Sequence, residues 1–376
     1  MFREGEGSLL YFDIDQKFLE HFKNLKQVFL YIINYCNLKC PHCIYKPNNQ
    51  FTIGEIEIPL ETAYRLLSDF HEMGARKLTL LGGEPTLYGT VNGQKEQIAE
   101  VIEMAGTIGY EYVRIDTNGI FDSSLLHNDK FKKVSEISFS LDGYDERSND
   151  RIRGPGSFKK SIAGIKAAVE LGYKVDLTCC VYDELLEKQG GEYALEKMIV
   201  LAEDHGVNRI NFHSLIKDGT AIDTWSGDLE VEPGKWVRVY EAISENIKNN
   251  KYKIPVRIPR AFITAAEFDD NPAYYGYCPA KLGERVLVHP DGIIRICSGL
   301  LGTAYGIADY YRNQIVWNDR KTNELIDHQF NKNTPCTNRG KKSYGDLVPL
   351  CFSFKPRQDE FVYKDLLNWE SRNRKK

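Results

Sequence analysis

Short apolar runs alternate with longer amphipathic segments over the first two thirds of the chain. A short apolar run favours a buried strand, whereas apolar residues spaced three and four apart favour a helix. Strands are predicted at residues 27–34, 77–81, 111–115, 135–141, 174–182 and 207–215. Helices are predicted from about Pro59, over 92–109, after Asp122, and over 157–171, 192–205 and 234–249.

The regular alternation of strands and helices predicts an α/β fold. Consecutive strand–helix units require a parallel sheet with right-handed crossovers. The units are too few for a closed eight-stranded barrel. In such a sheet the carboxyl ends of the strands meet at one edge, so the segments that follow the strands are expected to come together there.

Composition fits a large intracellular protein. The chain has 376 residues, 42% of them hydrophobic, which suggests two or three domains with a sizeable core. The net charge of −4 gives no electrostatic argument for nucleic acid. We find no apolar stretch that could span a membrane and no signal peptide, so a cytoplasmic location is expected. In that reducing compartment, nine cysteines favour metal ligation over disulfides.

Three cysteines follow the first predicted strand, at Cys36, Cys40 and Cys43. Thiolates are the usual protein ligands of iron–sulfur clusters. Because no fourth cysteine lies nearby, a four-iron cluster here would keep one iron open for a substrate or cofactor. The alternative is zinc with His42 as the fourth ligand, although adjacent residues such as His42 and Cys43 rarely both reach one tetrahedral ion.

A glycine-rich turn strengthens the iron–sulfur interpretation. The second predicted strand ends in Gly82-Gly83-Glu84-Pro85, and glycines there permit a tight turn and close approach of the backbone to a ligand. Together, the cysteine loop and this turn resemble the radical S-adenosylmethionine (SAM) superfamily. The resemblance implies a partial (β/α)6 TIM-like barrel and a [4Fe–4S] cluster whose open iron chelates SAM. It also implies a 5′-deoxyadenosyl radical that abstracts hydrogen from a substrate.

The same resemblance implies SAM contacts at the ends of the next strands. The GGE segment is expected to hold the amino group of SAM, and the hydroxyl and carboxylate of the segment SLDG are expected near its ribose. An arginine just beyond can pair with the carboxylate. The expected cofactor-binding residues are Gly82, Gly83, Glu84, Asn118, Ser140, Asp142 and Arg153. Without the upstream motifs, SLDG would be a plain strand-ending turn and Arg153 a surface ion pair.

Four late cysteines, Cys278, Cys297, Cys336 and Cys351, resemble the auxiliary-cluster extension of the SPASM/twitch subgroup. Two alternating segments flank Pro290-Asp291-Gly292, which predicts a hairpin. Four thiolates suffice for one cube, so the resemblance implies a C-terminal twitch extension, a β-hairpin plus helix, with one auxiliary [4Fe–4S] cluster. The wide gap between Cys336 and Cys351 departs from the family pattern. Zinc on the same thiolates, or four unrelated buried cysteines, are the alternatives.

Alternation in the last two barrel strands identifies side chains that face the lumen. Cys180 lies on the mixed face of the fifth strand, and Asn211 and His213 lie on the polar face of the sixth. Polar residues in a barrel mouth bind a ligand or one another, so Asn211 and His213 are candidate substrate contacts. A lumen thiol can give a hydrogen atom to a substrate radical, as in radical SAM epimerases, which makes Cys180 a candidate catalytic residue. A structural role for His213 and simple burial of Cys180 are the competing explanations.

The pattern divides the chain into three regions: a lead segment (1–26), the barrel (27–250), and a linker with the auxiliary-cluster domain and a C-terminal helix (251–376). The lead segment is too short for a fused leader-binding domain. The chain also ends without the glycine pair of the family's molybdenum cofactor enzyme, which argues against that activity.

We therefore expect a radical SAM oxidoreductase of natural product biosynthesis. Its expected substrate is a ribosomally made peptide that it oxidises, cross-links or epimerises. The alternative is a dehydrogenase, decarboxylase or epimerase of a small sugar, aminocyclitol or nucleoside intermediate. A flavodoxin or ferredoxin is the expected electron donor. A non-enzymatic iron–sulfur carrier would leave the GGEP and SLDG segments unexplained.

Overall fold

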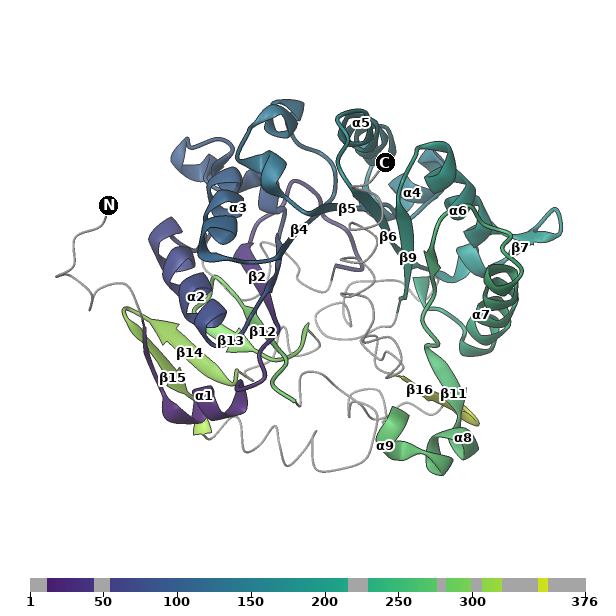
Figure 1. Cartoon of the computed structure of the whole chain (residues 1–376). Coiled ribbons are helices and arrows are strands. Elements are labelled where there is room, and N and C mark those ends of the chain that lie inside the picture. Colours follow the sequence, from purple (N-terminus) through teal and green to yellow (C-terminus); the bar gives the residue numbers. More distant parts are fainter. Residues whose placement is uncertain are drawn as a thin grey trace.

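The computed structural model describes residues 12–43, 55–215, 229–275, 282–298, 306–319 and 344–350. Its central feature is a curved sheet whose outer face is covered by helices, as Figure 1 shows. The parallel strands, in their order across the sheet, are β2 (Gln27–Ile33), β3 (Lys77–Gly82), β4 (Tyr112–Thr117), β5 (Glu136–Ser140), β6 (Val175–Val181), β9 (Arg209–Ser214) and β10 (Val256–Arg257). This order and orientation confirm the predicted α/β partial barrel.

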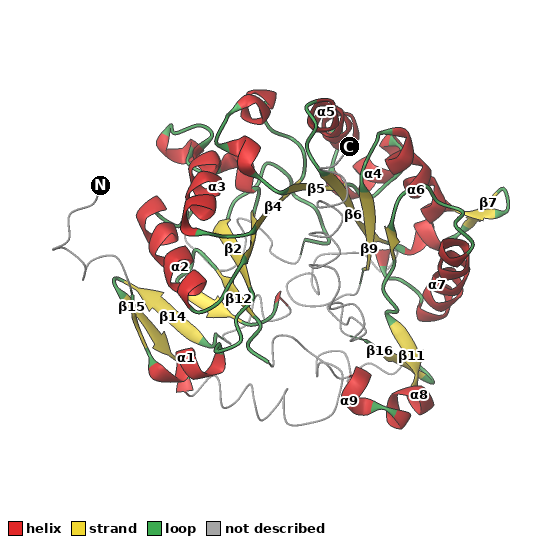
Figure 2. Cartoon of the chain, viewed as in Figure 1, coloured by secondary structure: helices red, strands yellow, loops and turns green. Residues whose placement is uncertain are grey.

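Helices connect consecutive strands and lie on the convex side of the sheet, drawn in red in Figure 2. They are α2 (Leu60–Glu72), α3 (Gln97–Ile108), α4 (Glu146–Arg153), α5 (Ser157–Glu170), α6 (Ala194–Asp204) and α7 (Pro233–Lys248). Helix α4 was not expected from the hydrophobic pattern, because its sequence is almost entirely polar. It begins at a capping box, in which the Asp145 side chain accepts from the N–H of Ser148 at 2.8 Å.

Two crossovers differ from the expected helices. After β3 the chain forms 3₁₀ turns at Pro85–Leu87 and Thr90–Asn92, and α3 begins later than predicted. After β4, further 3₁₀ turns at Ser123–His127 and Phe131–Lys133 replace the helix predicted after Asp122. In that crossover the Asp122 and Asn128 side chains accept from the N–H groups of nearby residues. Such local bonds compete with α-helical hydrogen bonding.

Alternation along β4, β5, β6 and β9 separates an apolar outer face from a polar lumen side, whereas Phe29, Tyr31 and Leu81 on β2 and β3 belong to a small apolar cluster apart from the main core. Outward residues such as Ile115, Phe139 and Leu177 are buried in the main hydrophobic core against the helices. The inward residues align in levels across neighbouring strands. One level contains Asp116, Ser138, Asp176 and Arg209, the next Ser140, Thr178 and Asn211, and the uppermost Cys180 and His213.

Buried charges close the lumen at the amino ends of the strands. Arg114 donates from Nη1 to Oε1 of Glu136 at 2.9 Å and from Nη2 to Ser138 at 2.7 Å. Arg209 donates to the same Glu136 oxygen at 2.9 Å and also contacts Asp176. Burial alone would raise the pKa of Glu136, but Arg114 and Arg209 lower it, so this carboxylate stays charged. We call Arg114, Glu136, Asp176 and Arg209 the lumen floor.

The predicted hairpin is present and extends the barrel sheet past β2. Strands β12 (Arg285–Val288) and β13 (Ile293–Arg295) pair antiparallel, and β12 lies parallel to β2. The sheet continues through β14 (Ala308–Tyr311), β15 (Gln314–Trp317) and β1 (Asp13–Ile14), and α1 (Gln16–His21) follows β1. The hairpin is therefore joined to the barrel by main-chain pairing. The expected C-terminal helix concerns residues outside those that the structure describes.

Two small sheets lie beside the barrel. They are β7 (Lys188–Gln189) with β8 (Glu192–Tyr193), and β11 (Phe262–Thr264) with β16 (Leu347–Pro349). The short helices α8 (Ala265–Asp270) and α9 (Pro272–Tyr275) follow β11. Among the described helices, none combines the length and the apolar character that a bilayer crossing requires.

Candidate functional site

The three cysteines lie in one loop at the carboxyl end of β2. Each of Cys36, Cys40 and Cys43 is half-buried. The N–H of Leu38 donates to Cys36 Sγ at 3.3 Å, and the N–H of Cys43 donates to the Cys40 carbonyl at 3.2 Å. Burial raises the pKa of Cys36 to about 12 and that of Cys40 to about 11, and the neighbouring thiols add to both shifts. Three partly buried thiols on one loop, within electrostatic reach of one another, fit a shared metal cluster, which stabilises thiolates.

The glycine turn after β3 is packed against the start of this loop. The N–H of Gly83 donates to the Ile33 carbonyl at 2.9 Å, and that of Glu84 donates to the Tyr35 carbonyl at 2.8 Å. A Cβ on Gly83 would lie 1.6 Å from the Tyr35 oxygen, and one on Gly82 would lie 2.5 Å from the Ile33 oxygen. The close backbone approach expected at the glycines is therefore made to the protein itself. Gly82 approaches Ile33, and Gly83 approaches Tyr35, the residue before Cys36.

The Glu84 side chain joins the ends of β3 and β4. Its carboxylate is buried and accepts from Thr86 Oγ1 and Thr117 Oγ1, each at 2.7 Å, and from the Asn118 N–H at 2.8 Å. Burial raises the pKa of Glu84, and these hydrogen bonds act against that rise. The structure thus places the carboxylate among donors of the protein itself, beside the cysteine loop.

Asn118 connects the end of β4 to the cysteine loop. Its Nδ2 donates to Asn37 Oδ1 at 2.7 Å and lies 3.6 Å from Cys36 Sγ, while its Oδ1 accepts from the Ile120 N–H at 2.8 Å. Asn37 in turn donates to the Ile120 carbonyl at 2.8 Å. These reciprocal amide contacts fix the first cysteine relative to the β4 turn.

A buried charge cluster lies at the end of β5, next to the same loop. Asp142 Oδ2 is 2.6 Å from Arg153 Nε and 3.2 Å from His42 Nε2, and Oδ1 accepts from the Cys180 N–H at 2.8 Å. Burial alone would raise the pKa of Asp142, but Arg153 and then His42 lower it. We call His42, Asp142, Arg153 and the Cys180 N–H the Asp142 cluster. Ser140, two residues before Asp142, is half-buried.

The predicted lumen residues have different surroundings. The Asn211 amide donates to Asp176 at 3.2 Å and to the Leu177 carbonyl at 3.3 Å, so it belongs to the network above the lumen floor. His213 is half-buried and lies opposite Cys180 in the sheet register. The Cys180 thiol lies at the Asp142 cluster, and burial raises its pKa well above its usual range.

Of the four late cysteines, the described residues include Cys297, which is half-buried. Cys278, Cys336 and Cys351 lie outside the described residues. Tyr31 on β2 stacks on His289, with ring centroids 4.2 Å apart. Burial raises the pKa of Tyr31, and the charges of Asp116, Cys297 and Cys43 add to the rise. Tyr31 is therefore within electrostatic reach of both the cysteine loop and the hairpin cysteine.

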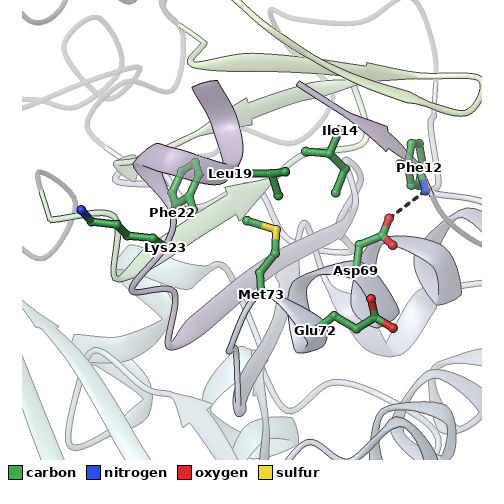
Figure 3. Close-up of a pocket in the computed structure, with 8 residues that line it drawn as sticks. All are labelled: Phe12, Ile14, Leu19, Phe22, Lys23, Asp69, Glu72 and Met73. Atoms are coloured by element: carbon green, nitrogen blue, oxygen red, sulfur yellow. Dashed lines mark hydrogen bonds between the residues drawn. The ribbon is translucent and has the colours of Figure 1, made fainter. Parts of the chain in front are cut away.

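A separate hollow lies outside the barrel, between β1, α1 and α2 (Figure 3). Its lining residues are Phe12, Ile14, Leu19, Phe22, Lys23, Asp69, Glu72 and Met73. The buried Asp69 carboxylate accepts from the Phe12 N–H at 2.9 Å. None of the residues predicted for the site lines this hollow.

The sequence analysis predicted the residues that lie at the strand ends, but it missed two residues whose side chains link these ends to the rest of the site. Thr117 and His42 both contact a predicted site carboxylate. Thr117 directly precedes Asn118 in the TNG segment, which was a usable signal. His42 stands inside the cysteine motif and was considered as a zinc ligand. The contact between His42 and Asp142 joins residues 100 positions apart in the sequence, and local sequence patterns do not encode such a contact.

Comparisons with known proteins agree with this geometry. Residues 30–188 match the model of the radical SAM superfamily. A GTP 3′,8-cyclase of Mannheimia succiniciproducens is 32% identical over 148 residues, which are 39% of this chain and 41% of that enzyme. Molybdenum cofactor biosynthesis protein 1 of Drosophila melanogaster is 29% identical over 161 residues, 41% of this chain and 26% of that protein. The chain thus spans less than half the length of these two relatives.

Solved structures show the same fold over a larger share of the chain. SuiB of Streptococcus suis, bound to its precursor peptide SuiA, has a TM-score of 0.61 and 17% identity over 84% of this chain and 70% of SuiB. The AdoMet-bound enzyme anSMEcpe has a TM-score of 0.61 and 16% identity over 92% of this chain and 98% of its own. The shared fold agrees with the predicted SPASM/twitch-type subgroup. Residues 30–188 of the chain thus match the radical SAM superfamily, and this match, with the AdoMet-bound structure of similar fold, implies a [4Fe–4S] cluster and SAM.

Proposed function

We propose that Cys36, Cys40 and Cys43 hold the SAM-binding cluster and that SAM lies at the carboxyl ends of β2 to β6. The observation that carries this proposal is the convergence of four strand ends on the cysteine loop. Glu84 and Asn118 connect β3 and β4 to that loop, and Asp142 connects β5 and β6 to it. The residues proposed to border SAM are Gly82, Gly83, Glu84, Asn118, Ser140, Asp142 and Arg153.

Cys36, Cys40 and Cys43 would hold the cluster, and the cluster with SAM would supply one-electron reductive cleavage of SAM. The electron would come from a flavodoxin or ferredoxin. The chain's own contribution is orientation. Asn118 holds Asn37 and Cys36, and the Glu84 carboxylate holds the ends of β3 and β4 together by accepting four hydrogen bonds. Fixed, buried polar groups of this kind need little rearrangement when a charged ligand binds.

The substrate would enter the lumen from the same edge, because the lumen floor fills the opposite end with paired charges. On β5, β6 and β9, the lumen-facing groups between these ends are hydroxyl, amide, imidazole and thiol side chains. They are Ser140, Thr178, Cys180, Asn211 and His213. Such a surface suits a substrate with several hydrogen-bonding groups. Asn211 and His213 are the proposed substrate contacts.

We favour a ribosomally made peptide as the substrate. The support comes from fold likeness over most of the chain to SuiB bound to its precursor peptide and to anSMEcpe bound to the Kp18Cys peptide. A nucleotide or another small natural-product intermediate is the second candidate, because the curated relatives include GTP 3′,8-cyclases. These relatives match 39% and 50% of this chain, and the family model matches residues 30–188, so the similarity supports SAM chemistry more directly than it supports GTP as a substrate.

The region after residue 250 is proposed to carry one auxiliary [4Fe–4S] cluster on Cys278, Cys297, Cys336 and Cys351. Main-chain pairing of β12 with β2 attaches the Cys297 hairpin directly to the barrel. The Tyr31–His289 stack lies where these two strands meet. A fully ligated cluster in this place would accept an electron from a substrate radical, which makes the overall reaction an oxidation.

Epimerisation would instead need a hydrogen atom for the substrate radical. The Cys180 thiol is the candidate donor, since burial raises its pKa and the sulfur keeps its hydrogen at neutral pH. We favour oxidation, because four cysteines are available for electron transfer and one lumen thiol is available for hydrogen transfer.

Iron counting tests the two proposed clusters. After anaerobic reconstitution the wild-type chain should hold about eight irons, and replacement of Cys36, Cys40 and Cys43 by Ala should leave about four. Cys179→Ala is the matched control, because this buried thiol faces the core and should not change the count. A triple variant with all its iron, or zinc in the late site, would contradict the assignment.

The choice between oxidation and epimerisation is tested in Cys180→Ala with a peptide substrate. Oxidation predicts near-normal product. Loss of product with continued 5′-deoxyadenosine formation, together with one solvent deuterium in the wild-type product, would show epimerisation.

A further inference from the structure

The side chain of His42 is buried and reaches Asp142 at the end of β5. It is 6% exposed, and its Nε2 lies 3.2 Å from Oδ2 of Asp142. Cys40 and Cys43 stand two positions before and one position after it in the same loop. This contact therefore ties the middle of the cysteine motif to the end of β5.

Asp142 connects the end of β5 to three other segments of the chain. Its carboxylate contacts His42 in the cysteine loop, Arg153 at the end of α4 and the Cys180 N–H on β6. Its own N–H donates to Asn149 Oδ1 at 2.9 Å. Because the Asp142 side chain is fully buried, water cannot take the place of a partner that is removed here.

A metal ion could in principle use the same groups. One ligand atom each of His42, Asp142 and Cys180 lie within 4.8 Å of one another. However, the Arg153 guanidinium is already 2.6 Å from Asp142 and carries the positive charge that balances it. A divalent ion between these residues would be repelled by that guanidinium at short range. The geometry therefore favours a positioning role over a metal site.

We propose that His42 is a positioning residue that, through Asp142, holds the cysteine loop in register with the SAM pocket. The inference rests on the proposed function, in which the loop carries the cluster and Asp142 borders SAM. SAM would contact both parts at once, so a loop that is already fixed lowers the ordering cost of binding. Without the His42–Asp142 contact, this cost would be added to SAM binding, while the three cysteines would remain available to the cluster.

The test compares three variants of the reconstituted full-length chain. His42→Phe fills the space without a polar atom. His42→Gln restores an N–H at the approximate position of Nε2. Arg147→Gln is the control, because Arg147 lies on the same helix as Arg153 but forms an exposed ion pair with Glu184. Iron and zinc content, the SAM dissociation constant by equilibrium dialysis, and the EPR spectrum of the reduced protein with and without SAM are measured for each.

We expect His42→Phe to keep its iron but bind SAM about tenfold more weakly, which corresponds to about 1.4 kcal/mol. The SAM-induced change in its EPR spectrum should then need a higher SAM concentration. His42→Gln should recover most of the affinity, and Arg147→Gln should match the wild type. If His42→Phe loses iron, a His42→Gln variant with normal iron and SAM affinity would still support the proposal.

Two results would overturn the inference alone. One is wild-type SAM affinity in an iron-loaded His42→Phe variant. The other is loss of iron in both His42 variants, which would make the histidine a ligand or a folding residue. A wild-type chain that holds zinc, or that carries iron and binds no SAM, would instead overturn the proposed function and the inference with it.

Discussion

The lumen floor and the Asp142 cluster place buried charges at opposite ends of the same barrel strands, and they differ in what they connect. The floor joins strand to strand: Arg114 and Arg209 share Glu136 across β4, β5 and β9. The Asp142 cluster joins a loop and a helix to the strand ends, through His42 and Arg153. The comparison indicates that similar buried ion pairs close the barrel at one end and, at the other, organise the region proposed to bind SAM.

Removing one charge from the floor should give the largest loss of stability. Glu136→Gln leaves Arg114 and Arg209 without a shared carboxylate, and breaking such a buried pair costs about 3–5 kcal/mol of unfolding free energy. SAM affinity of the folded protein should stay near the wild-type value, because the floor lies away from the strand ends. Urea unfolding and SAM binding measure the two effects separately.

The control is Glu103→Gln, since Glu103 pairs with Lys130 and Lys133 at the surface, where water and salt screen the charges, and its loss should change stability little. A fully folded Glu136→Gln protein that loses SAM binding would remove the distinction between the two ends of the barrel.

A smaller loss of stability, centred on the cysteine loop, is expected when a glycine of the turn after β3 is replaced. In Gly83→Ala the new methyl group would lie 1.6 Å from the Tyr35 carbonyl oxygen, so the turn must move away from the cysteine loop. Overpacking of this kind costs about 1–3 kcal/mol, and here the iron content of the SAM cluster should fall as well. Gly106→Ala in α3 is the matched control, because a Cβ added there would meet no heavy atom within 4 Å. Equal iron content in both variants would show that the turn does not shape the cysteine loop.

The smallest expected effect on stability comes from Asp69 in the outer hollow. It should not depend on the lumen floor or on the Asp142 cluster. Burial raises the pKa of Asp69 to about 7, while the Phe12 N–H opposes the rise. A carboxyl group with a raised pKa in the folded state stabilises the fold most at low pH, and this contribution is lost as the pH rises through the folded pKa. The unfolding midpoint should therefore fall between about pH 4 and pH 7, and Asp69→Asn should flatten that slope. An unchanged slope in the variant would assign the pH dependence to other groups.

Much of the barrel could be predicted because each strand is a local apolar run with clear bounds. The exceptions have physical causes. Helix α4 lacks an apolar stripe and is marked by its Asp145 capping box. The crossover after Asp122 forms 3₁₀ turns because side chains there bond the local backbone. The parallel pairing of β12 with β2 joins segments more than 250 residues apart, and no local pattern encodes it.

The candidate site also combines residues that local sequence patterns predict with contacts that those patterns do not encode. The cysteines, the glycine turn and Asp142 stand in short motifs, so their proximity could be expected from the parallel sheet alone. The donors that saturate Glu84 and the His42–Asp142 contact arise only when the strand ends meet. Sequence therefore indicated which residues gather at the site, while their hydrogen-bonding partners required the structure.

The central claim is that the cysteine loop supports reductive cleavage of SAM, and 5′-deoxyadenosine formation tests it most directly. Reconstituted wild-type protein, reduced with dithionite and supplied with SAM, should yield 5′-deoxyadenosine and methionine in equal amounts. Cys40→Ala should yield neither, because two thiolates do not retain the cluster, whereas Cys179→Ala should retain the activity. An iron-loaded wild-type protein that forms no 5′-deoxyadenosine, or a Cys40→Ala variant that forms as much as the wild type, would contradict the account.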